Sequence, residues 1–269
     1  EQNPLLDTSK KYNSIVKAYK SINLSSKSSD SKHVTKSTES AITYLGPKGY
    51  SVMKNSISAL TLQQLKDELL ASANISTMQF APVDKFELYR ENASKIYIPR
   101  HFGVSKFGPP GENRLPTPIV ALMPFIGELR DYQNNIVDTY VKSMPIGGGL
   151  LEIPCGRGKT VMGLKIASII GLKTLVLVHK KFLADQWIER IQQFLPNARI
   201  GRIQGKIYDI ENKDIVIGMV QTLSKHQFPA STFTQFGLTI VDEVHHLGAR
   251  VFVRSLFQIV TTYMVGLSA

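Results

Sequence analysis

The stretch LEIPCGRGKT, residues 151–160, decides how the rest of this chain is interpreted. Its last three residues, Gly158, Lys159 and Thr160, end like a phosphate-binding loop, whose general pattern is G-x-x-x-x-G-K-[ST]. That pattern places its first glycine at position 153, where this sequence has Ile153. The stretch is therefore either a nucleotide site with a different arrangement of glycines or a turn that contains Gly-Lys-Thr by chance.

The segments on either side of this loop favour a nucleotide site. Apolar residues at 149–154 predict a strand, and the pattern at 159–171 predicts a helix that Gly171 ends. A glycine loop between a strand and a helix N-terminus points backbone N–H groups at a phosphate. In such a site Lys159 neutralises the β- and γ-phosphates of a nucleotide, and the Thr160 hydroxyl binds Mg²⁺. The nucleotide-binding residues expected from this loop are Cys155, Gly156, Arg157, Gly158, Lys159 and Thr160.

The stretch LTIVDEVHH, residues 238–246, supplies the second half of a phosphate site. An apolar strand ends directly in Asp242 and Glu243. We expect Asp242 to hold Mg²⁺, usually through water, and Glu243 to orient and deprotonate the attacking water, so that Lys159, Asp242 and Glu243 are the catalytic residues. The alternative is an acidic strand end that caps the next helix. The two histidines that follow do not indicate a zinc site, because no second His/Cys cluster with a recognisable spacing is present.

Strand-like and helical patterns alternate along the C-terminal half. Near-continuous apolar strands between helices predict an α/β fold, with a parallel sheet covered by helices on both faces. The carboxyl ends of such strands carry the chemistry, and both phosphate motifs fall there. Beyond the two strands already named, strands are expected at 173–179, 198–205, 214–220 and 263–269, and helices at 181–196, 221–225 and 249–260.

The N-terminal half has a different organisation. Residues 1–40 are rich in Ser, Lys and Thr and poor in large apolar residues, which predicts a disordered or linker-like segment. Residues 41–118 predict a small α+β accessory region, whose Gly/Pro-dense end at 108–118 marks the boundary to a domain at 119–269. Within the accessory region we expect a helix at 61–72 with Thr61 as its N-cap, and two strands around a turn within 86–103.

Basic and aromatic residues alternate in part of the accessory region. Such an arrangement is found on surfaces that bind a nucleic-acid strand. The alternative, which we favour, is that two amphipathic strands pack their rings in the ordinary way. The residues concerned are Tyr89, Arg90, Tyr97, Arg100, His101 and Phe102.

Composition and net charge limit the classes of protein to which this chain can belong. The 269 residues are 43% hydrophobic and 20% charged, so the chain can form a packed core. A formal charge of +11, spread over both halves, indicates a polyanionic partner, with a merely basic solvated surface as the alternative. No apolar run approaches the ~20 residues that span a bilayer, no signal peptide is visible, and we expect a soluble, intracellular protein without a membrane partner. The single cysteine, Cys155, excludes an internal disulfide and is expected to be a small packing residue.

Several motifs, in this order, resemble those of superfamily-two helicases. PCGRGKT (154–160), DEVH (242–245) and the closing GLSA (266–269) look like motifs I, II and the first part of III. Motif I of that group runs x-x-G-x-G-K-T, so no glycine is expected at position 153 and Gly156 takes over its role. Together with HKKFLADQW (179–187), these motifs are similar to those of XPB-like helicases of large nucleocytoplasmic DNA viruses.

The resemblance implies roles for residues outside motifs I and II. LRDYQ (129–133) resembles an adenine-recognition element, in which Gln133 would pair with the adenine edge because an amide both donates and accepts. Residues 175–187 resemble motif Ia and residues 217–223 resemble motif Ib, which line the track for a strand's phosphates. Without the resemblance, the two lysines of motif Ia are interpreted as a solvated loop, and Trp187 is expected mainly in the core. By resemblance, the nucleic-acid-binding residues are His179, Lys180, Lys181, Gln221 and Thr222, and the residues that couple nucleotide state to a second motor domain are His245, Ser268 and Ala269.

The resemblance implies the N-terminal portion and first RecA-like motor domain of an ATP-dependent DNA helicase or translocase, with ATP and Mg²⁺ as cofactors. The chain begins without Met and stops directly after a strand-like run, so we expect it to be part of a longer polypeptide that carries a second RecA-like domain. An isolated first domain is expected to be nearly inactive, since an arginine from elsewhere can contribute ~10³–10⁵ in rate. The alternatives are an RNA helicase, the motor subunit of a restriction system, and a nucleic-acid-binding scaffold with a degenerate motor.

Overall fold

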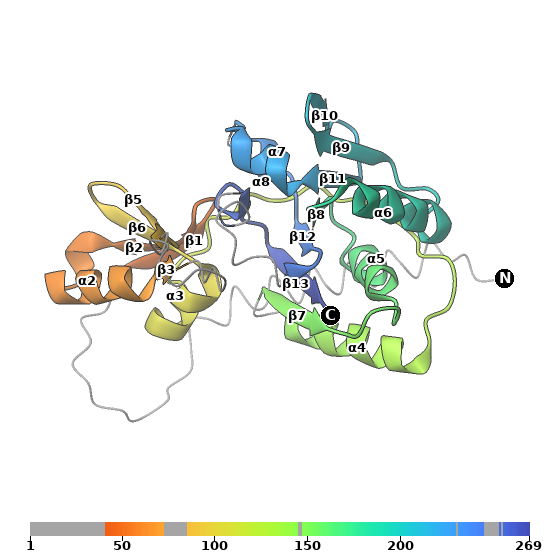
Figure 1. The fold of residues 1–269 in the computed structure, drawn as a ribbon. Coiled ribbons are helices and arrows are strands. Elements are labelled where there is room, and N and C mark those ends of the chain that lie inside the picture. The colour runs from red at the N-terminus through yellow and green to blue at the C-terminus, as the bar shows by residue number, and fades with distance from the viewer. Residues whose placement is uncertain (1–40, 73–84, 145–146, 230, 245–252, 254) are drawn as a thin grey trace, which may run out of the picture.

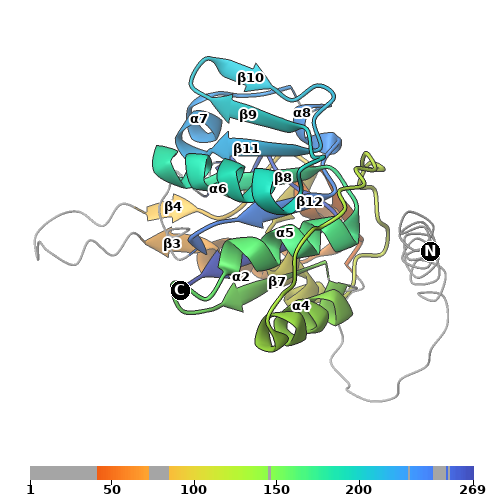
Figure 2. The same ribbon diagram turned by 90° about the vertical axis from the view of Figure 1, so that its right-hand side faces the viewer.

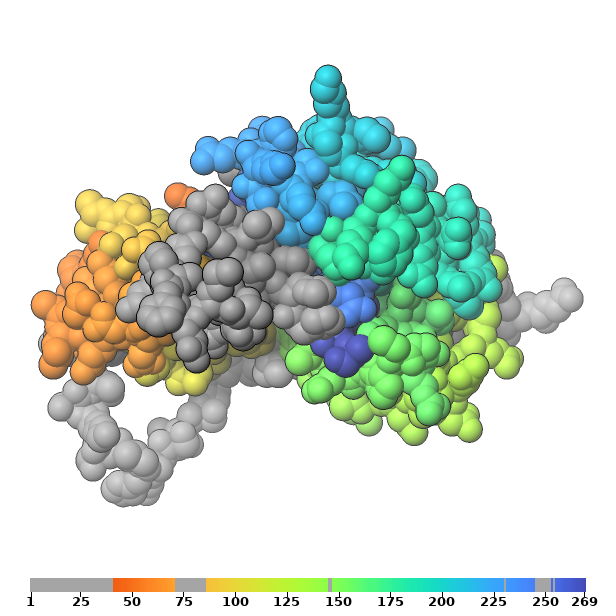
Figure 3. Space-filling model, viewed as in Figure 1, coloured from red at the N-terminus to blue at the C-terminus, as the bar shows by residue number. Residues whose placement is uncertain are grey.

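The computed structural model describes residues 41–72, 85–144, 147–229, 231–244, 253 and 255–269 (Figure 1). The segment expected to be a linker, 1–40, lies outside these residues, as do residues 249–252 and 254 of the helix expected at 249–260. The described chain forms a small region followed by a larger α/β region. In the space-filling view the small region, orange to yellow, lies on the left and the large region, green to blue, lies on the right (Figure 3).

The small region is built on a four-stranded antiparallel sheet with the order β1-β2-β6-β5. Its core contains buried apolar side chains from the sheet, such as Tyr50 and Ile96, and from one helix, Leu65 and Leu69. The elements of this region are β1 (Thr43–Gly46), β2 (Gly49–Met53), η1 (Lys54–Ser56), α2 (Ala59–Glu68), β5 (Arg90–Glu91), β6 (Lys95–Ile98) and α3 (Arg100–Phe107), with β3 (Leu70–Ser72) and β4 (Lys85–Glu87) as a separate antiparallel pair.

Two details of the small region differ from the sequence predictions. The predicted N-cap of α2, Thr61, is wrong: the cap is Ser58, whose Oγ accepts the backbone N–H of Thr61 at 3.0 Å. A serine hydroxyl at this position satisfies a backbone donor that the helix leaves free. The helix α3, which begins after Pro99, was not predicted, because its sequence lacks a clear apolar period.

The larger region is built on a seven-stranded sheet with the order β10-β9-β11-β8-β12-β13-β7. Every neighbouring pair is parallel except β10 with β9, which form an antiparallel hairpin at the edge. All five residues of the central strand β8 are buried, as expected for a strand covered on both faces. The elements are α4 (Asp131–Ser143), β7 (Gly148–Glu152), α5 (Lys159–Ile170), β8 (Thr174–Val178), α6 (Lys181–Phe194), β9 (Ile200–Gln204), β10 (Ile207–Asp209), β11 (Ile215–Met219), α7 (Val220–Lys225), α8 (Ser231–Thr234), β12 (Leu238–Val241) and β13 (Tyr263–Ser268).

Helices cover both faces of this sheet. One face packs against α4, α5 and α6, which lie in front of the strands in Figure 2, and its core includes Ile166 and Trp187. The opposite face packs against α7 and α8 through Leu223 and Phe233. The predicted α/β class, with a parallel sheet covered on both sides, is confirmed.

The Gly/Pro-dense segment passes from the small sheet to the large region. The backbone of Leu45 in β1 exchanges hydrogen bonds with Glu112 (2.9 Å) and Arg114 (2.7 Å). Further along, Ala121 N–H donates to the carbonyl of Gly171 at 2.9 Å, beside the large sheet. The backbone is thus hydrogen-bonded to the small sheet up to residue 114 and to the large region from residue 119. The division into domains at 118 stays a prediction.

Arg100 of α3 fastens the small region to the large sheet. Its Nη1 donates to the carbonyls of Thr262 (2.8 Å) and Gly147 (3.2 Å), and its Nη2 donates to Thr261 (3.2 Å). A Cβ at Gly147 would stand 2.2 Å from Nη1, so the glycine is needed for this close approach. These carbonyls lie just before β13 and β7, the strands whose other ends lead to Ser268 and to the phosphate loop.

A second contact between the regions involves Arg90 of β5. Its Nη2 donates to the carbonyl of Phe257, and its guanidinium carbon lies 4.9 Å from the centre of the Phe257 ring. Tyr89 and Tyr97 are each only 8% exposed. Two of the rings considered for strand binding are thus packed, as the favoured alternative predicts, whereas Arg100, His101 and Phe102 lie in helix α3 rather than in a strand, and His101 is exposed. Binding of a nucleic-acid strand by this set stays an alternative. Among the described residues, no helix is long and apolar enough to cross a membrane.

Candidate nucleotide-binding site

The phosphate motifs meet at the carboxyl edge of the large sheet. The order β12-β13-β7 places the loop after β7 two strands away from Asp242, which follows β12. Between them lies the end of β13, where the carbonyl of Ser268 accepts the backbone N–H of Ile153 at 2.9 Å. Ile153 is only 5% exposed and continues the pairing of β7 with β13. The residue that stands where a general phosphate loop has a glycine is therefore an extension of the strand.

Two glycines shape the loop itself. Gly156 has φ +75° and Gly158 has φ +84°, in the left-handed region that side chains with a Cβ disfavour. A Cβ at Gly158 would also stand 2.4 Å from Nε2 of Gln133, whereas a Cβ at Gly156 would meet nothing within 4 Å. Gly158 is the N-cap of α5, with no side-chain bond to the first helical N–H groups. The helix thus begins with free backbone donors, which is the arrangement that binds a phosphate.

The ammonium group of Lys159 has no hydrogen-bond acceptor in the described part of the protein. Its Nζ is buried, makes no hydrogen bond, and lies 3.6 Å from Oε1 of Glu243. A buried ammonium without hydrogen-bond partners costs free energy, so the site is suited to a ligand with several acceptor oxygens. A nucleotide's phosphates meet this requirement.

Asp242 and Glu243 form a tight turn at the end of β12. Asp242 is 5% exposed, and its Oδ1 accepts the backbone N–H of Glu243 at 3.0 Å. Glu243 itself has φ +53°, an uncommon conformation for a residue with a side chain. Burial raises the pKa of the Asp242 carboxyl above its usual range, although a hydrogen bond from Trp187 acts in the opposite direction. Backbone strain of this kind is concentrated at functional sites.

The residues present fit a magnesium ion held together with a phosphate. Among the described residues, no group of three or more His, Cys, Asp and Glu side chains could hold a metal alone. Mg²⁺ is bound through one or two carboxylates, substrate phosphates and water rather than by an all-protein cage. Asp242 and the hydroxyl of Thr160, the second residue of α5, are the groups this chain offers.

The structure also shows a site residue that the sequence assigned mainly to the core. Trp187 is 1% exposed and packs in the core as expected, but its Nε1 also donates to Oδ2 of Asp242 at 2.8 Å. Apolar spacing correctly predicted burial of its ring. A buried indole N–H needs an acceptor, and this is the one signal that points to a second role.

Gln133 and Tyr132 hold the phosphate loop from the first turn of α4. Nε2 of Gln133 (3.0 Å) and the hydroxyl of Tyr132 (2.9 Å) both donate to the carbonyl of Arg157. Oε1 of Gln133 accepts the backbone N–H of Arg130 at 3.0 Å. One amide hydrogen and one lone pair of Gln133 remain for a further partner, so adenine recognition stays a prediction. Sequence reasoning missed Tyr132, whose position beside Gln133 was the only indication.

The residues expected to contact nucleic acid lie between β8 and α6 and at the start of α7, two segments that are in contact. Gln221 Nε2 donates to the carbonyl of His179 at 2.6 Å, which joins the start of α7 to the end of β8. Lys180 and Lys181 are exposed at the start of α6. Thr222 is 8% exposed, and its hydroxyl accepts the backbone N–H of Gly205 at 2.9 Å, so this side chain is turned inward. The nucleic-acid contacts stay predictions.

The coupling residues are placed only in part. His245 lies outside the described residues. Ser268 is 7% exposed and its backbone is paired with the phosphate-loop strand, while Ala269 is exposed next to it. Cys155 is an exposed free cysteine rather than a packing residue, because the loop turns it away from the core.

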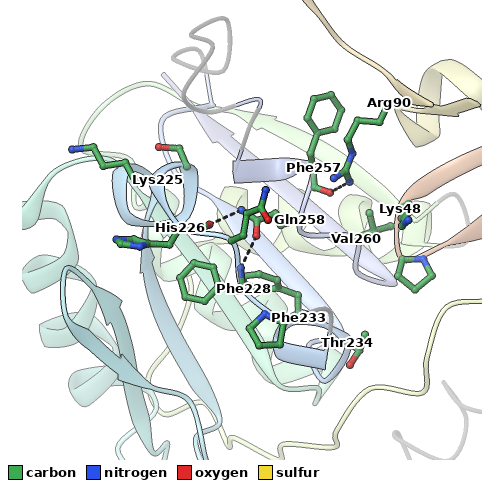
Figure 4. Close-up of a pocket in the computed structure, with 14 residues that line it drawn as sticks. Lys48, Arg90, Lys225, His226, Phe228, Phe233, Thr234, Phe257, Gln258 and Val260 are labelled. Atoms are coloured by element: carbon green, nitrogen blue, oxygen red, sulfur yellow. Dashed lines mark hydrogen bonds between the residues drawn. The ribbon is translucent and has the colours of Figure 1, made fainter. Parts of the chain in front are cut away.

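A cavity of about 580 Å³ lies at the junction of the two regions, away from the phosphate loop (Figure 4). Lys48 and Arg90 line it from the small region, and Lys225 and His226 line it from the end of α7. Gln258 also lines the cavity, and its Nε2 donates to the carbonyls of Leu223 (2.7 Å) and His226 (3.1 Å). Its described lining residues include no Asp or Glu and none of the residues expected to bind nucleotide.

Comparisons with known proteins agree with this geometry. The family model described as "Type III restriction enzyme, res subunit" matches residues 126–269. The chain is 37% identical over 228 residues to a protein of Acanthamoeba polyphaga mimivirus whose name places it among ATP-dependent RNA helicases, covering 82% of this chain and 44% of that protein. It is 33% identical over 142 residues to the DNA 3′-5′ translocase XPB2 of Sulfurisphaera tokodaii, covering 53% of this chain and 30% of the relative.

Among solved structures, the UvsW helicase from bacteriophage T4 shares the fold. The TM-score is 0.51 at 19% sequence identity, over 78% of this chain and 86% of that one. The chain spans less than half the length of the two relatives compared by sequence. The family match covers more than half of the present chain, and the resemblance to superfamily-two helicases is confirmed. The chain therefore belongs to the superfamily-two helicase family whose model is described as the res subunit of type III restriction enzymes, with viral helicases and an XPB-type translocase among its relatives.

Proposed function

We propose that this chain is the first motor domain, with an N-terminal accessory region, of an enzyme that hydrolyses ATP to move along nucleic acid. The observation that carries the proposal is the buried Lys159 ammonium, which makes no hydrogen bond and stands beside Glu243 at the end of a glycine-shaped loop. Family membership supports the same function, since the relatives are named as helicases and a translocase.

Each residue of the site has a definite task in this proposal. The loop N–H groups at 156–160 and Lys159 hold the β- and γ-phosphates, and Gln133 reads the adenine edge. Glu243 accepts a proton from the attacking water. Mg²⁺, held by Thr160 and Asp242 when bound, neutralises the charge that develops on the transferred phosphoryl group.

Nucleic acid is the proposed partner along which the motor moves. The net charge of +11 favours a polyanion, and Lys180 and Lys181 are exposed next to His179, to which Gln221 of α7 is hydrogen-bonded. Cations from both regions also line the junction cavity. We propose DNA as the polymer, because the motifs are similar to those of XPB-like enzymes; RNA is the alternative, because the mimivirus relative is named an RNA helicase. A restriction-system motor and a scaffold with a degenerate motor are two further candidate functions.

The central test is Glu243→Gln in the full-length protein. The substitution keeps the size of the side chain but removes the base, so ATP hydrolysis should fall by ~10²-fold or more while ATP binding persists. Glu189→Gln, at an exposed position of α6, is the matched control and should hydrolyse ATP at the wild-type rate. Normal turnover by the Glu243 variant would show that the base is assigned to the wrong residue.

The identity of the polymer is tested separately. ATP hydrolysis by the full-length protein is measured with single-stranded DNA and with RNA of the same sequence. Stronger stimulation by DNA supports the proposal, and stronger stimulation by RNA selects the RNA helicase. Stimulation by neither, with ATP still bound, favours the scaffold. A nuclease motif in the rest of the polypeptide would favour a restriction-system motor.

A further inference from the structure

Trp187 lies inside the protein between the two motifs of the nucleotide site. Its indole Nε1 donates to Oδ2 of Asp242 at 2.8 Å, and both side chains are buried. The other end of the ring faces α5: a Cβ at Gly163 would stand 3.3 Å from its Cη2 atom. Since α5 begins at Lys159, the same side chain touches the helix of the phosphate loop and the carboxylate at the end of β12.

The carboxylate of Asp242 is held from two sides. Oδ1 accepts the backbone N–H of Glu243 at 3.0 Å, and Oδ2 accepts the N–H of Trp187. An indole nitrogen is a donor only, so its bond fixes the direction of one carboxylate oxygen. Each oxygen keeps a further lone pair, which is what an ion or its water shell requires.

The Trp187–Asp242 hydrogen bond also affects Glu243, the residue that follows Asp242. The N–H that Asp242 accepts belongs to Glu243, whose backbone has φ +53°. Such a conformation persists only where the surrounding structure holds it. Fixing the carboxylate of Asp242 therefore fixes one end of the turn from which the Glu243 side chain starts.

We propose that Trp187 is a positioning residue of the ATPase site: its N–H orients the Asp242 carboxylate toward Mg²⁺ and supports the Glu243 turn, while its ring sets the spacing to α5. This inference rests on the proposed function, which assigns Asp242 and Glu243 to Mg²⁺ and ATP. A tryptophan that only filled the core would also need an acceptor for its N–H, but that acceptor would not have to be the carboxylate expected to hold Mg²⁺.

The first test separates the N–H from the packing. Trp187→Phe in the 269-residue chain keeps an aromatic ring and removes the donor, while Ile191→Val, one turn further along α6 and equally buried, trims packing alone. The affinity for ATP is measured by calorimetry with Mg²⁺ and with EDTA, together with the melting temperature. Both variants should melt earlier, but only Trp187→Phe should reduce the Mg²⁺-dependent gain in affinity, on the order of tenfold, with the affinity in EDTA changed less than about twofold.

The outcomes distinguish this inference from the function on which it rests. If wild-type protein gains affinity from Mg²⁺ and Trp187→Phe gains as much, the positioning role is overturned and the proposed function stands. If wild-type protein does not bind ATP with Mg²⁺ at all, the proposed function fails and the inference fails with it.

A spectroscopic measurement covers the case in which Trp187→Phe does not fold. Trp187 is the only tryptophan of the chain, so its indole N–H gives a single, unambiguous proton–nitrogen resonance. In wild-type protein this proton should exchange slowly with water, and its resonance should move more on addition of ADP with Mg²⁺ than of ADP with EDTA. Asp242→Asn should shift the resonance and speed its exchange by at least about tenfold. If neither Mg²⁺ with ADP nor Asp242→Asn changes the position or the exchange rate of the indole resonance, the proposal is overturned.

Discussion

Lys159 carries a positive charge that the protein leaves without a hydrogen bond. Its nearest anionic group is Glu243, with 3.6 Å between the charged atoms, and its side chain is 11% exposed. An ion pair at that distance does not repay the loss of water around a buried ammonium. The charge is therefore better explained by binding than by stability.

This explanation predicts the behaviour of Lys159→Met. The melting temperature of the protein without ligand should stay the same or rise, because a buried, unsatisfied charge is replaced by an apolar group of similar length. The stabilisation that ATP with Mg²⁺ gives the wild type, about 2.7 kcal/mol at a hundred times the Kd, should disappear. Thermal unfolding with and without ATP measures both effects. A variant that melts much earlier without ligand would mean that Lys159 is a structural residue.

The two loop glycines provide a matched pair of substitutions. Gly156→Ala and Gly158→Ala both place a Cβ at positive φ, at a cost of about 1 kcal/mol each. Only at Gly158 does the new atom collide with a neighbour, Nε2 of Gln133 at 2.4 Å. We expect Gly158→Ala to destabilise the protein measurably more in urea unfolding, since Gln133 must give up its bond to the loop. Equal losses for the two variants would show that the loop can move away from α4 without cost.

At the scale of single elements, Asp214 ties the start of β11 to the chain before β9. Its carboxylate accepts three hydrogen bonds from Arg199: the backbone N–H (2.8 Å), Nε (2.9 Å) and Nη2 (2.8 Å). Burial acts to raise the pKa of Asp214, but the Arg199 hydrogen bonds outweigh it and lower the pKa below 3.8. The carboxylate form is thus preferred in the folded state.

The sign of this pKa shift gives a prediction for stability against pH. A carboxylate with a lowered pKa stabilises the fold fully above its unfolded pKa, and the contribution is lost as pH falls through the folded value. Asp214→Asn should therefore cost about 1 to 2 kcal/mol at pH 7, and the difference from wild type should shrink below about pH 4. Urea unfolding at the two pH values measures it. Asp209→Asn, whose partner Lys213 is 3.1 Å away on the surface, is the control and should change little at either pH.

The elements that sequence reasoning found are those with strong local signals. Four apolar residues in a row, 175–178, predicted β8, and glycine in the left-handed conformation ended α5 at Gly171, as expected. The hairpin of β10 was missed because its three residues, Ile207–Asp209, are all exposed and have no apolar alternation. The spacing of apolar residues predicts which side chains are buried, but it does not predict which polar groups form hydrogen bonds in the fold. Spacing therefore predicted that Trp187 is buried, while only the fold shows that its N–H reaches Asp242.

At the scale of the whole molecule, the small region is joined to the large sheet at the end of β7 and β13 that lies opposite the candidate nucleotide site. The carbonyls that Arg100 holds precede β7 and β13. The opposite ends of these strands lead to the phosphate loop and to Ser268, which are themselves linked by the Ile153–Ser268 hydrogen bond. Two adjacent parallel strands, β7 and β13, therefore connect the Arg100 contacts with the candidate nucleotide site.

Arg100→Ala tests whether this joint holds the two regions together. A hydrogen bond from a charged guanidinium contributes about 1.5 to 3 kcal/mol net of the bonds to water that it replaces. Amide exchange at residues 147–149 and 261–264 should therefore become faster, on the order of tenfold to a hundredfold. Lys106→Ala, on the same helix and paired with Glu68 at the surface, should leave it unchanged. If amide exchange also becomes faster at residues 153–158, the small region influences the phosphate loop through β7 and β13. If exchange becomes faster only at the starts of these strands, Arg100 holds the two regions together without affecting the loop.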